Sequence, residues 1–178
     1  MVQRKSNVID LAIPIEQIED APGYRSNVGL ILANGDRQVL WAHRLGQRGW
    51  QFPQGGIEPA ESIFDAAYRE LFEEVGVEDH QVDFIASTRR WIHYDLPRRL
   101  LRKRSDLGQF KGQRQIWMLF YLQSGDSSIR LSLSKEPEFD QWRWVDFWLP
   151  LDEIVAFKKN AYQSALAELE PHLRLYFG

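Results

Sequence analysis

The feature that most constrains this chain is a set of three glutamates, Glu70, Glu73 and Glu74, in a stretch that otherwise reads as an amphipathic helix. Residues spaced i, i+3 and i+4 share one helical face, within an arc of about 100°. Carboxylates placed in this way repel each other, by roughly 1–4 kcal/mol per close pair at surface dielectrics. A divalent cation would relieve the repulsion, and oxygen ligands without Cys or His favour Mg²⁺ or Mn²⁺ over zinc. For Glu73 and Glu74 alone, an acidic solvated face is the alternative explanation.

The glutamates belong to a longer stretch, residues 55–77, which we call the glutamate motif. Gly55 and Gly56 predict a tight loop with positive φ and a close backbone approach to a ligand. A helix is expected to follow, with Pro59 in its first turn and Gly76 as its C-terminal stop. Its apolar residues recur at helical spacing and predict a face that packs on a core: Ile63, Phe64, Ala67, Leu71 and Val75.

The glutamate motif resembles the signature box of the Nudix hydrolases, which cleave a diphosphate bond in a nucleoside diphosphate linked to another group. The shared pattern is Gly, five residues, Glu, seven residues, Arg-Glu, an apolar residue, any residue, Glu-Glu, any residue, Gly and an apolar residue. All nine fixed positions are filled, by Gly55, Glu61, Arg69, Glu70, Leu71, Glu73, Glu74, Gly76 and Val77.

The resemblance implies roles for these residues. Glu70, Glu73 and Glu74 are expected to bind two or three Mg²⁺ (or Mn²⁺) ions, and a backbone carbonyl near Gly55 is expected to complete the ligand set. Glu61 and Arg69 are expected to be mainly architectural. Arg69 lies eight residues after Glu61 and four before Glu73, so it is placed to brace both carboxylates.

Length and composition limit the domain organisation and the protein classes that fit this chain. At 178 residues, 44% of them apolar and 26% charged, it predicts a single folded domain, residues 23–178, after an N-terminal arm, residues 1–22. That arm is expected to be either flexible or packed on an edge of the domain. No Cys is present, which excludes disulfides and thiolate metal sites. No apolar run reaches membrane-spanning length and no secretory signal is seen, so a cytoplasmic protein is expected.

The pattern of strands and helices predicts an α/β fold. Strands are expected at 28–33, 38–43, 82–94, 116–122 and 142–145, with a hairpin turn at Asn34-Gly35-Asp36. Helices are expected within the glutamate motif and at 151–169. Mixed strands covered by two helices fit an α/β/α sandwich with a central mixed sheet. The Nudix resemblance implies the same fold.

Segments outside the glutamate motif point to a substrate class. Residues 23–29, 50–56, 68–76, 137–140, 142–144 and 157–158 together resemble the bacterial RNA pyrophosphohydrolases, which convert 5′-triphosphorylated RNA to 5′-monophosphorylated RNA and so promote RNA decay. Hydrolases of diadenosine tetraphosphate share several of these segments, so dinucleoside polyphosphates are the alternative substrates. A Nudix-fold sensor of RNA or nucleotides, without catalysis, is a third hypothesis, which the complete set of metal-binding glutamates disfavours. No protein partner is indicated.

Further residues are candidates for catalysis and substrate contact. Glu138, in Pro-Glu-Phe-Asp, is expected to orient or deprotonate water or to bind another metal. The resemblance places Arg25 and Arg44 beside the phosphates or the RNA, and it assigns Phe157 to base stacking and Lys158 to a backbone or base contact. A core position is the alternative for Phe157. Residues 98–114 hold seven basic residues and one acid, which fits either an RNA-backbone footprint or a solvated loop.

Overall fold

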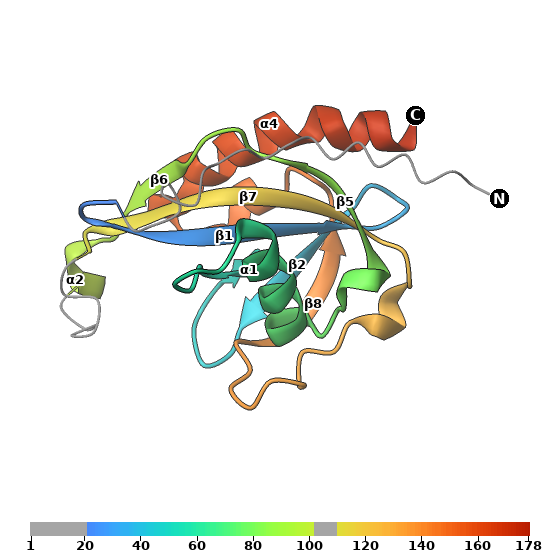
Figure 1. The fold of residues 1–178 in the computed structure, drawn as a ribbon, viewed down its shortest axis with the longest axis horizontal. Coiled ribbons are helices and arrows are strands. Elements are labelled where there is room, and N and C mark those ends of the chain that lie inside the picture. Colours follow the sequence, from blue (N-terminus) through green and yellow to red (C-terminus); the bar gives the residue numbers. More distant parts are fainter. Residues whose placement is uncertain (1–20, 102–109) are drawn as a thin grey trace.

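A mixed sheet forms the centre of the computed structural model, which describes residues 21–101 and 110–178 (Figure 1). Strands β3 (Trp50–Gln51), β2 (Val39–Arg44), β1 (Tyr24–Ala33), β7 (Gly112–Leu122) and β5 (Val82–Ser87) follow one another in that order across the sheet. Three more strands join this path: β4 (Gln54–Gly56) pairs with β1, β6 (Ile92–Asp95) with β7 and β8 (Phe139–Val145) with β2. Only β1 and β7 run parallel among these pairs.

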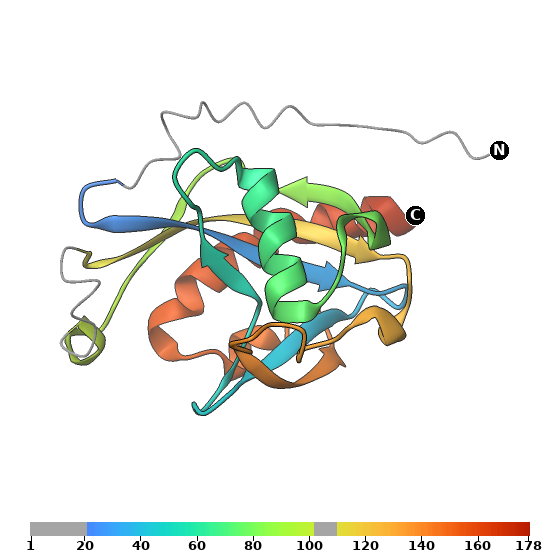
Figure 2. The same cartoon turned by 60° about the horizontal axis from the view of Figure 1, so that its bottom comes forward.

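One face of the sheet is covered by the helix of the glutamate motif. Figure 2 shows α1 (Ile63–Glu70) crossing the front of the sheet, and η2 (Leu71–Val75) continues it as a π-helical turn. Ser62 caps α1 by accepting the backbone N–H of Asp65 at 3.1 Å. Gly76 ends η2 with φ of 75°, in the left-handed region where glycine is favoured. The buried side chains of α1 and η2, from Ile63 to Val75, pack on alternate residues of β1 and β7.

The other face is covered by α4 (Lys159–Phe177), which lies above the sheet in Figure 1. Tyr162, Leu166 and Leu169 of α4 are fully buried against the second set of β1 and β7 residues, such as Ile31 and Trp117. The alternation of strand side chains therefore builds two cores, one under each helical layer. This confirms the predicted α/β fold with helices on both sides of a mixed sheet.

Shorter elements connect these layers. Two short helices stand beside the sheet, α2 (Arg98–Leu101) and α3 (Pro150–Glu153). Within residues 21–101 and 110–178, 3₁₀ turns also lie in the connections: η3 (Asp79–Gln81), η5 (Asp126–Ser128) and η6 (Ala156–Lys158). None of the helices in the described residues is long and apolar enough to cross a bilayer.

The predicted strands are confirmed, with bounds that differ by one to four residues, and the segment 82–94 divides into β5 and β6. The predicted helix at 151–169 is wrong in its first part. Helix α3 ends at Glu153, because its C-cap Ile154 has an extended ψ of 147°, and α4 begins only after η6. The break turns Val155 outwards, where it is 41% exposed, although the helical pattern placed it on the apolar side.

Two further expectations need correction. Pro59 precedes the helix rather than lying in its first turn, because the cap is Ser62. Gly55 and Gly56 lie in β4 and do not have positive φ. The predicted N-terminal arm lies outside the described residues up to position 20, as do Arg102, Lys103 and Arg104 of the basic segment.

Candidate active site

Arg69 organises the carboxylates of the glutamate motif. Its Nε and Nη2 donate to the two oxygens of Glu61 at 2.8 and 2.9 Å, and Nη2 also donates to the Gly56 carbonyl at 2.8 Å. Nη1 donates to Glu70 at 2.7 Å and lies 3.3 Å from Glu73. The hydrogen bonds to Arg69 are the largest cause that lowers the pKa of Glu61 below its ordinary value. Arg69 thus ties the loop before α1 to the acidic end of the helix.

Glu70 lies against the backbone of Gly55. A Cβ built on Gly55 would fall 1.8 Å from the carboxyl carbon of Glu70, so a larger residue there would have to displace the Glu70 carboxylate. The pairing of Gly55 with Val28 fixes this strand against β1. Glu70 is 8% exposed, and burial raises the pKa of its carboxyl while Arg69 opposes the rise. The glycine of the motif is therefore required by close approach rather than by backbone conformation.

Glu74 is the most enclosed of the three glutamates. It is 4% exposed, and its Oε2 accepts the backbone N–H of Gln54 at 2.8 Å. Its Oε1 is buried and has no hydrogen-bond partner within residues 21–101 and 110–178. Burial, followed by the charges of Glu138 and Glu70, holds the pKa of Glu74 well above its ordinary value. A buried carboxylate oxygen without a donor is costly, and a cation would offset that cost.

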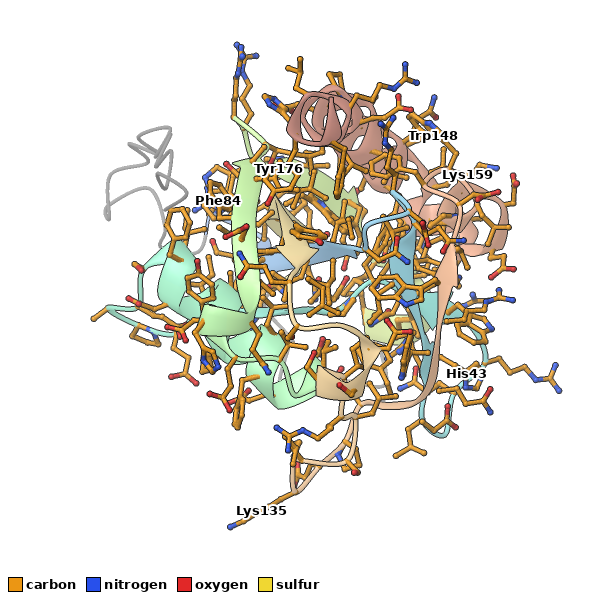
Figure 3. The ribbon with its side chains drawn as sticks, turned by 90° about the vertical axis from the view of Figure 1, so that its right-hand side faces the viewer. His43, Phe84, Lys135, Trp148, Lys159 and Tyr176 are labelled. Carbon is orange, nitrogen blue, oxygen red and sulfur yellow. The ribbon has the colours of Figure 1, made fainter. Side chains whose placement is uncertain are left out.

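The structure brings Glu138 to the same cluster, although it lies on a different segment. The loop before β8 extends away from the sheet, with Lys135 at its outer tip (Figure 3), and Glu138 is its last residue before β8 begins at Phe139. The Glu138 carbonyl accepts the Leu45 N–H at 2.8 Å, which anchors this end of the loop. The charge of Glu138 raises the pKa of both Glu70 and Glu74. Glu73 has a side chain that is 51% exposed and faces solvent from the same helical end.

These residues fit a hard divalent cation. The donors are carboxylate oxygens, one of them buried and without a partner, and the Gly55 backbone lies beside Glu70. Burial, and after it the neighbouring carboxylates, raise the pKa of Glu70 and of Glu74, and a bound cation would favour their charged forms. Among the described residues, no three or more His, Cys, Asp or Glu side chains are yet arranged closely enough to hold a metal ion together. The guanidinium of Arg69 instead occupies oxygens of Glu70 and Glu73.

Lys158 is buried next to this cluster rather than exposed to solvent. It is 6% exposed, and its Nζ donates to Oε1 of Gln51 at 3.1 Å and to Oε1 of Gln54 at 3.2 Å. The Nζ also lies 5.5 Å from the centroid of the Tyr94 ring. The neighbouring amide of Gln115 donates to Oε1 of Gln54 at 3.2 Å. A polar interior therefore adjoins the carboxylates on the side of α4.

The remaining candidates lie at the edges of this interior. Phe157 is half-buried, and its ring centroid is 6.0 Å from that of Tyr94, so it is neither a full core residue nor a free platform. Arg25 is exposed and its guanidinium covers the backbone of Gly56. Arg44 pairs with Phe139 at a register shift between β2 and β8.

The glutamates, Gly55, Glu138 and Arg69 are thus brought together from four segments of the chain. Sequence reasoning missed three amides as parts of the site: the buried Gln51 and Gln115 and the half-buried Gln54. The sequence does contain an indication of them. These glutamines lie next to strongly apolar strand segments, where a buried polar side chain needs a hydrogen-bond partner.

Comparisons with known proteins agree with this geometry. The profile of the NUDIX domain matches residues 23–169. An RNA pyrophosphohydrolase of Pseudomonas savastanoi pv. phaseolicola is 52% identical over 154 residues, covering 86% of this chain and 96% of that protein. An RNA pyrophosphohydrolase of Halorhodospira halophila is 48% identical over 155 residues, covering 87% of this chain and 84% of that protein.

Solved structures support the fold alone, because their sequence identity is low. The E. coli dihydroneopterin triphosphate pyrophosphohydrolase aligns with a TM-score of 0.64 at 18% identity, covering 82% of this chain and 98% of that one. A C. elegans Ap4A hydrolase in a binary complex aligns with a TM-score of 0.60 at 18% identity, covering 83% of this chain and 98% of that one.

Proposed function

The chain belongs to the NUDIX family, and we propose that it is a metal-dependent RNA pyrophosphohydrolase that converts 5′-triphosphorylated RNA to 5′-monophosphorylated RNA. Relatives that are about half identical to it over most of its length carry that name. Nudix hydrolases use divalent metal ions. The observation that carries the proposal is Glu74, a buried carboxylate with an unpartnered oxygen beside Glu70 and Glu138.

Glu70, Glu73 and Glu74 would hold the metal, Mg²⁺ or Mn²⁺, with the Gly55 carbonyl and Glu138 as further ligands. When bound, such a cation neutralises charge on phosphate oxygens and lowers the pKa of a coordinated water. The chain's own residues supply the rest. Arg69 keeps the loop and helix of the motif in register through Glu61 and Gly56, so that the Gly55 backbone and Glu70 stay in contact.

Glu138 lies opposite the helical glutamates, on a separate and anchored loop end. From there it would orient the attacking water and accept its proton, in addition to binding metal. The water oxygen forms a bond to phosphorus as the anhydride P–O bond breaks, and the leaving phosphate oxygen takes the electron pair. The 5′-monophosphate results whether the two terminal phosphates leave together as pyrophosphate or in two such steps. Arg25, whose guanidinium lies against Gly56, and Arg44, which pairs with Phe139 next to Glu138 in sequence, would hold the phosphate oxygens.

RNA as the substrate is supported by features that a simple nucleoside triphosphate does not need. Phe157, half-buried beside Tyr94, would stack on a base, and Lys158 would contact the base or backbone from the polar interior. Among the described residues, Arg98, Arg99, Lys111 and Arg114 add positive charge along one end of the sheet.

The test is to identify the product. RNA carrying a labelled 5′-triphosphate is incubated with the purified chain and Mg²⁺, and its 5′ ends are resolved. The proposal predicts conversion to a 5′-monophosphate, loss of activity with a chelator, and recovery when Mg²⁺ or Mn²⁺ is added back. RNA that keeps its triphosphate under these conditions, while a dinucleoside polyphosphate is cleaved, would contradict it.

A further inference from the structure

Gln54 lies between the proposed metal ligand Glu74 and the proposed RNA contact Lys158. Its backbone N–H donates to Oε2 of Glu74 at 2.8 Å. Its side-chain Oε1 accepts from Lys158 Nζ and from Gln115 Nε2, each at 3.2 Å. One residue therefore contacts the proposed metal ligand through its backbone and the proposed RNA contact through its side chain.

The side-chain contacts of Gln54 come from two elements that are far apart in sequence. Lys158 ends η6, just before α4, and Gln115 belongs to β7. A buried ammonium group needs acceptors, and amide oxygens of Gln51 and Gln54 serve Lys158 in this way. Because two donors converge on its Oε1, the Gln54 amide is fixed relative to both elements.

The backbone of Gln54 is paired with Gly29 of β1, and the fixed side chain adds a second restraint, toward β7 and η6. Strand β4 has only three residues, and it pairs with β1 along one side. Pro53 precedes it and has no N–H to offer. The described residues provide Glu74 with one hydrogen-bond donor, the Gln54 N–H, because Oε1 of Glu74 has no partner there. A shift of the Gln54 backbone therefore moves the group that orients Glu74.

We propose that Gln54 is a positioning residue that couples Lys158 to Glu74, so that RNA contact at Lys158 and metal binding at Glu74 favour each other. This inference rests on the proposed function for the roles of those two residues. Coupling of two binding events is reciprocal: whatever strengthens metal binding when RNA is present strengthens RNA binding when metal is present by the same factor.

Gln51 provides the matched control. Like Gln54 it accepts from Lys158 Nζ, and it comes from the same Gln-Phe-Pro-Gln segment, but no hydrogen bond joins it to Glu74 in the described structure. Methionine has nearly the length and volume of glutamine without its amide. Gln54→Met and Gln51→Met therefore each remove one acceptor from Lys158, and only Gln54→Met disturbs the link to Glu74.

The first measurement uses no RNA. Mn²⁺ is titrated calorimetrically into metal-free wild type, Gln54→Met and Gln51→Met, with melting temperatures as the folding control. The proposal predicts that Mn²⁺ binds about three- to ten-fold more weakly to Gln54→Met and within about two-fold of wild type to Gln51→Met. Wild-type affinity in Gln54→Met, or an equal loss in both variants, would overturn it. If Gln54→Met does not fold, Gln54→Asn, which keeps an amide but is one methylene too short, decides in its place.

The second measurement is KM for 5′-triphosphorylated RNA at saturating Mn²⁺. Both variants should raise KM, by about ten-fold, because each removes an acceptor from a charged donor. An unchanged KM in Gln54→Met would refute the part of the proposal that concerns Lys158. If the wild type hydrolyses no RNA, the proposed function fails, and the Mn²⁺ titration still decides whether Gln54 positions Glu74.

Discussion

Replacing Glu61 by Gln should reduce stability at least as visibly as catalysis. Glu61 makes three hydrogen bonds: Oε1 accepts from Arg69 Nε, and Oε2 accepts from Arg69 Nη2 and from the Glu58 N–H. A glutamine has one oxygen, so its NH₂ group must face at least one of these donors. The Glu61 and Arg69 side chains are only 13% and 24% exposed, so the pair is worth more than a solvated ion pair.

Hydrogen bonds to charged groups contribute about 1.5–3 kcal/mol, and we expect Glu61→Gln to cost about 2 kcal/mol. For a domain of this size, that corresponds to a fall in Tm of about 4–8 °C. The same substitution at the exposed Glu58, in the same loop, is the matched control and should change Tm by less than about 2 °C.

The pH dependence of this difference follows from the lowered pKa of Glu61. A carboxyl whose pKa is lowered in the folded state stabilises it above the ordinary pKa of 4.5, and this stabilisation is lost as the pH falls through the folded value. The difference in Tm between wild type and Glu61→Gln should therefore be constant from about pH 8 to 6 and shrink below about pH 4.5. An unchanged Tm together with abolished turnover would refute the reasoning, since Glu61 would then act on the reaction directly.

Three other substitutions probe the site. Glu74→Gln should lower turnover by more than about 100-fold at saturating Mg²⁺, without lowering Tm at pH 8, because burial disfavours its charged form; turnover within a few-fold of wild type would remove Glu74 from the metal site. Phe157→Ala should lower kcat/KM for RNA by roughly 5- to 150-fold and affect diadenosine tetraphosphate less; equal losses with a large fall in Tm would make Phe157 a core residue. Gly55→Ala should displace Glu70 and weaken Mn²⁺ binding measured by calorimetry, whereas Gly35→Ala, where a Cβ meets no atom within 4 Å, should not.

The sequence predicted the fold and the carboxylate cluster where local patterns determine them. The alternation of β1 and β7 and the helical stripe from Ile63 to Val75 were sufficient for both layers of the core. The spacing of the glutamate motif was sufficient to bring Arg69 to Glu61, Glu70 and Glu73. These features depend on residues close in sequence, where helix and strand periodicity act directly.

The parts that were missed depend on contacts distant in sequence. Buried Lys158 donates to amides from β3 and β4, and an amide of β7 bonds the latter; no local pattern joins these three strands. The helical stripe at 151–169 continued through Ile154 and Val155, although the chain leaves the helix there to begin η6. For Gly55, composition alone did not distinguish a positive φ from a close approach, and only the position of the Glu70 carboxyl decides between them.

The central claim is most directly tested by measuring kcat/KM side by side for 5′-triphosphorylated RNA and diadenosine tetraphosphate. Both rates are measured with purified wild type in saturating Mg²⁺, with Glu74→Gln as the blank. We expect kcat/KM for RNA to be at least about ten-fold higher than for diadenosine tetraphosphate, which corresponds to one base-stacking contact that the dinucleotide lacks. Glu74→Gln should hydrolyse neither substrate. Equal or better hydrolysis of the dinucleotide by wild type would contradict it.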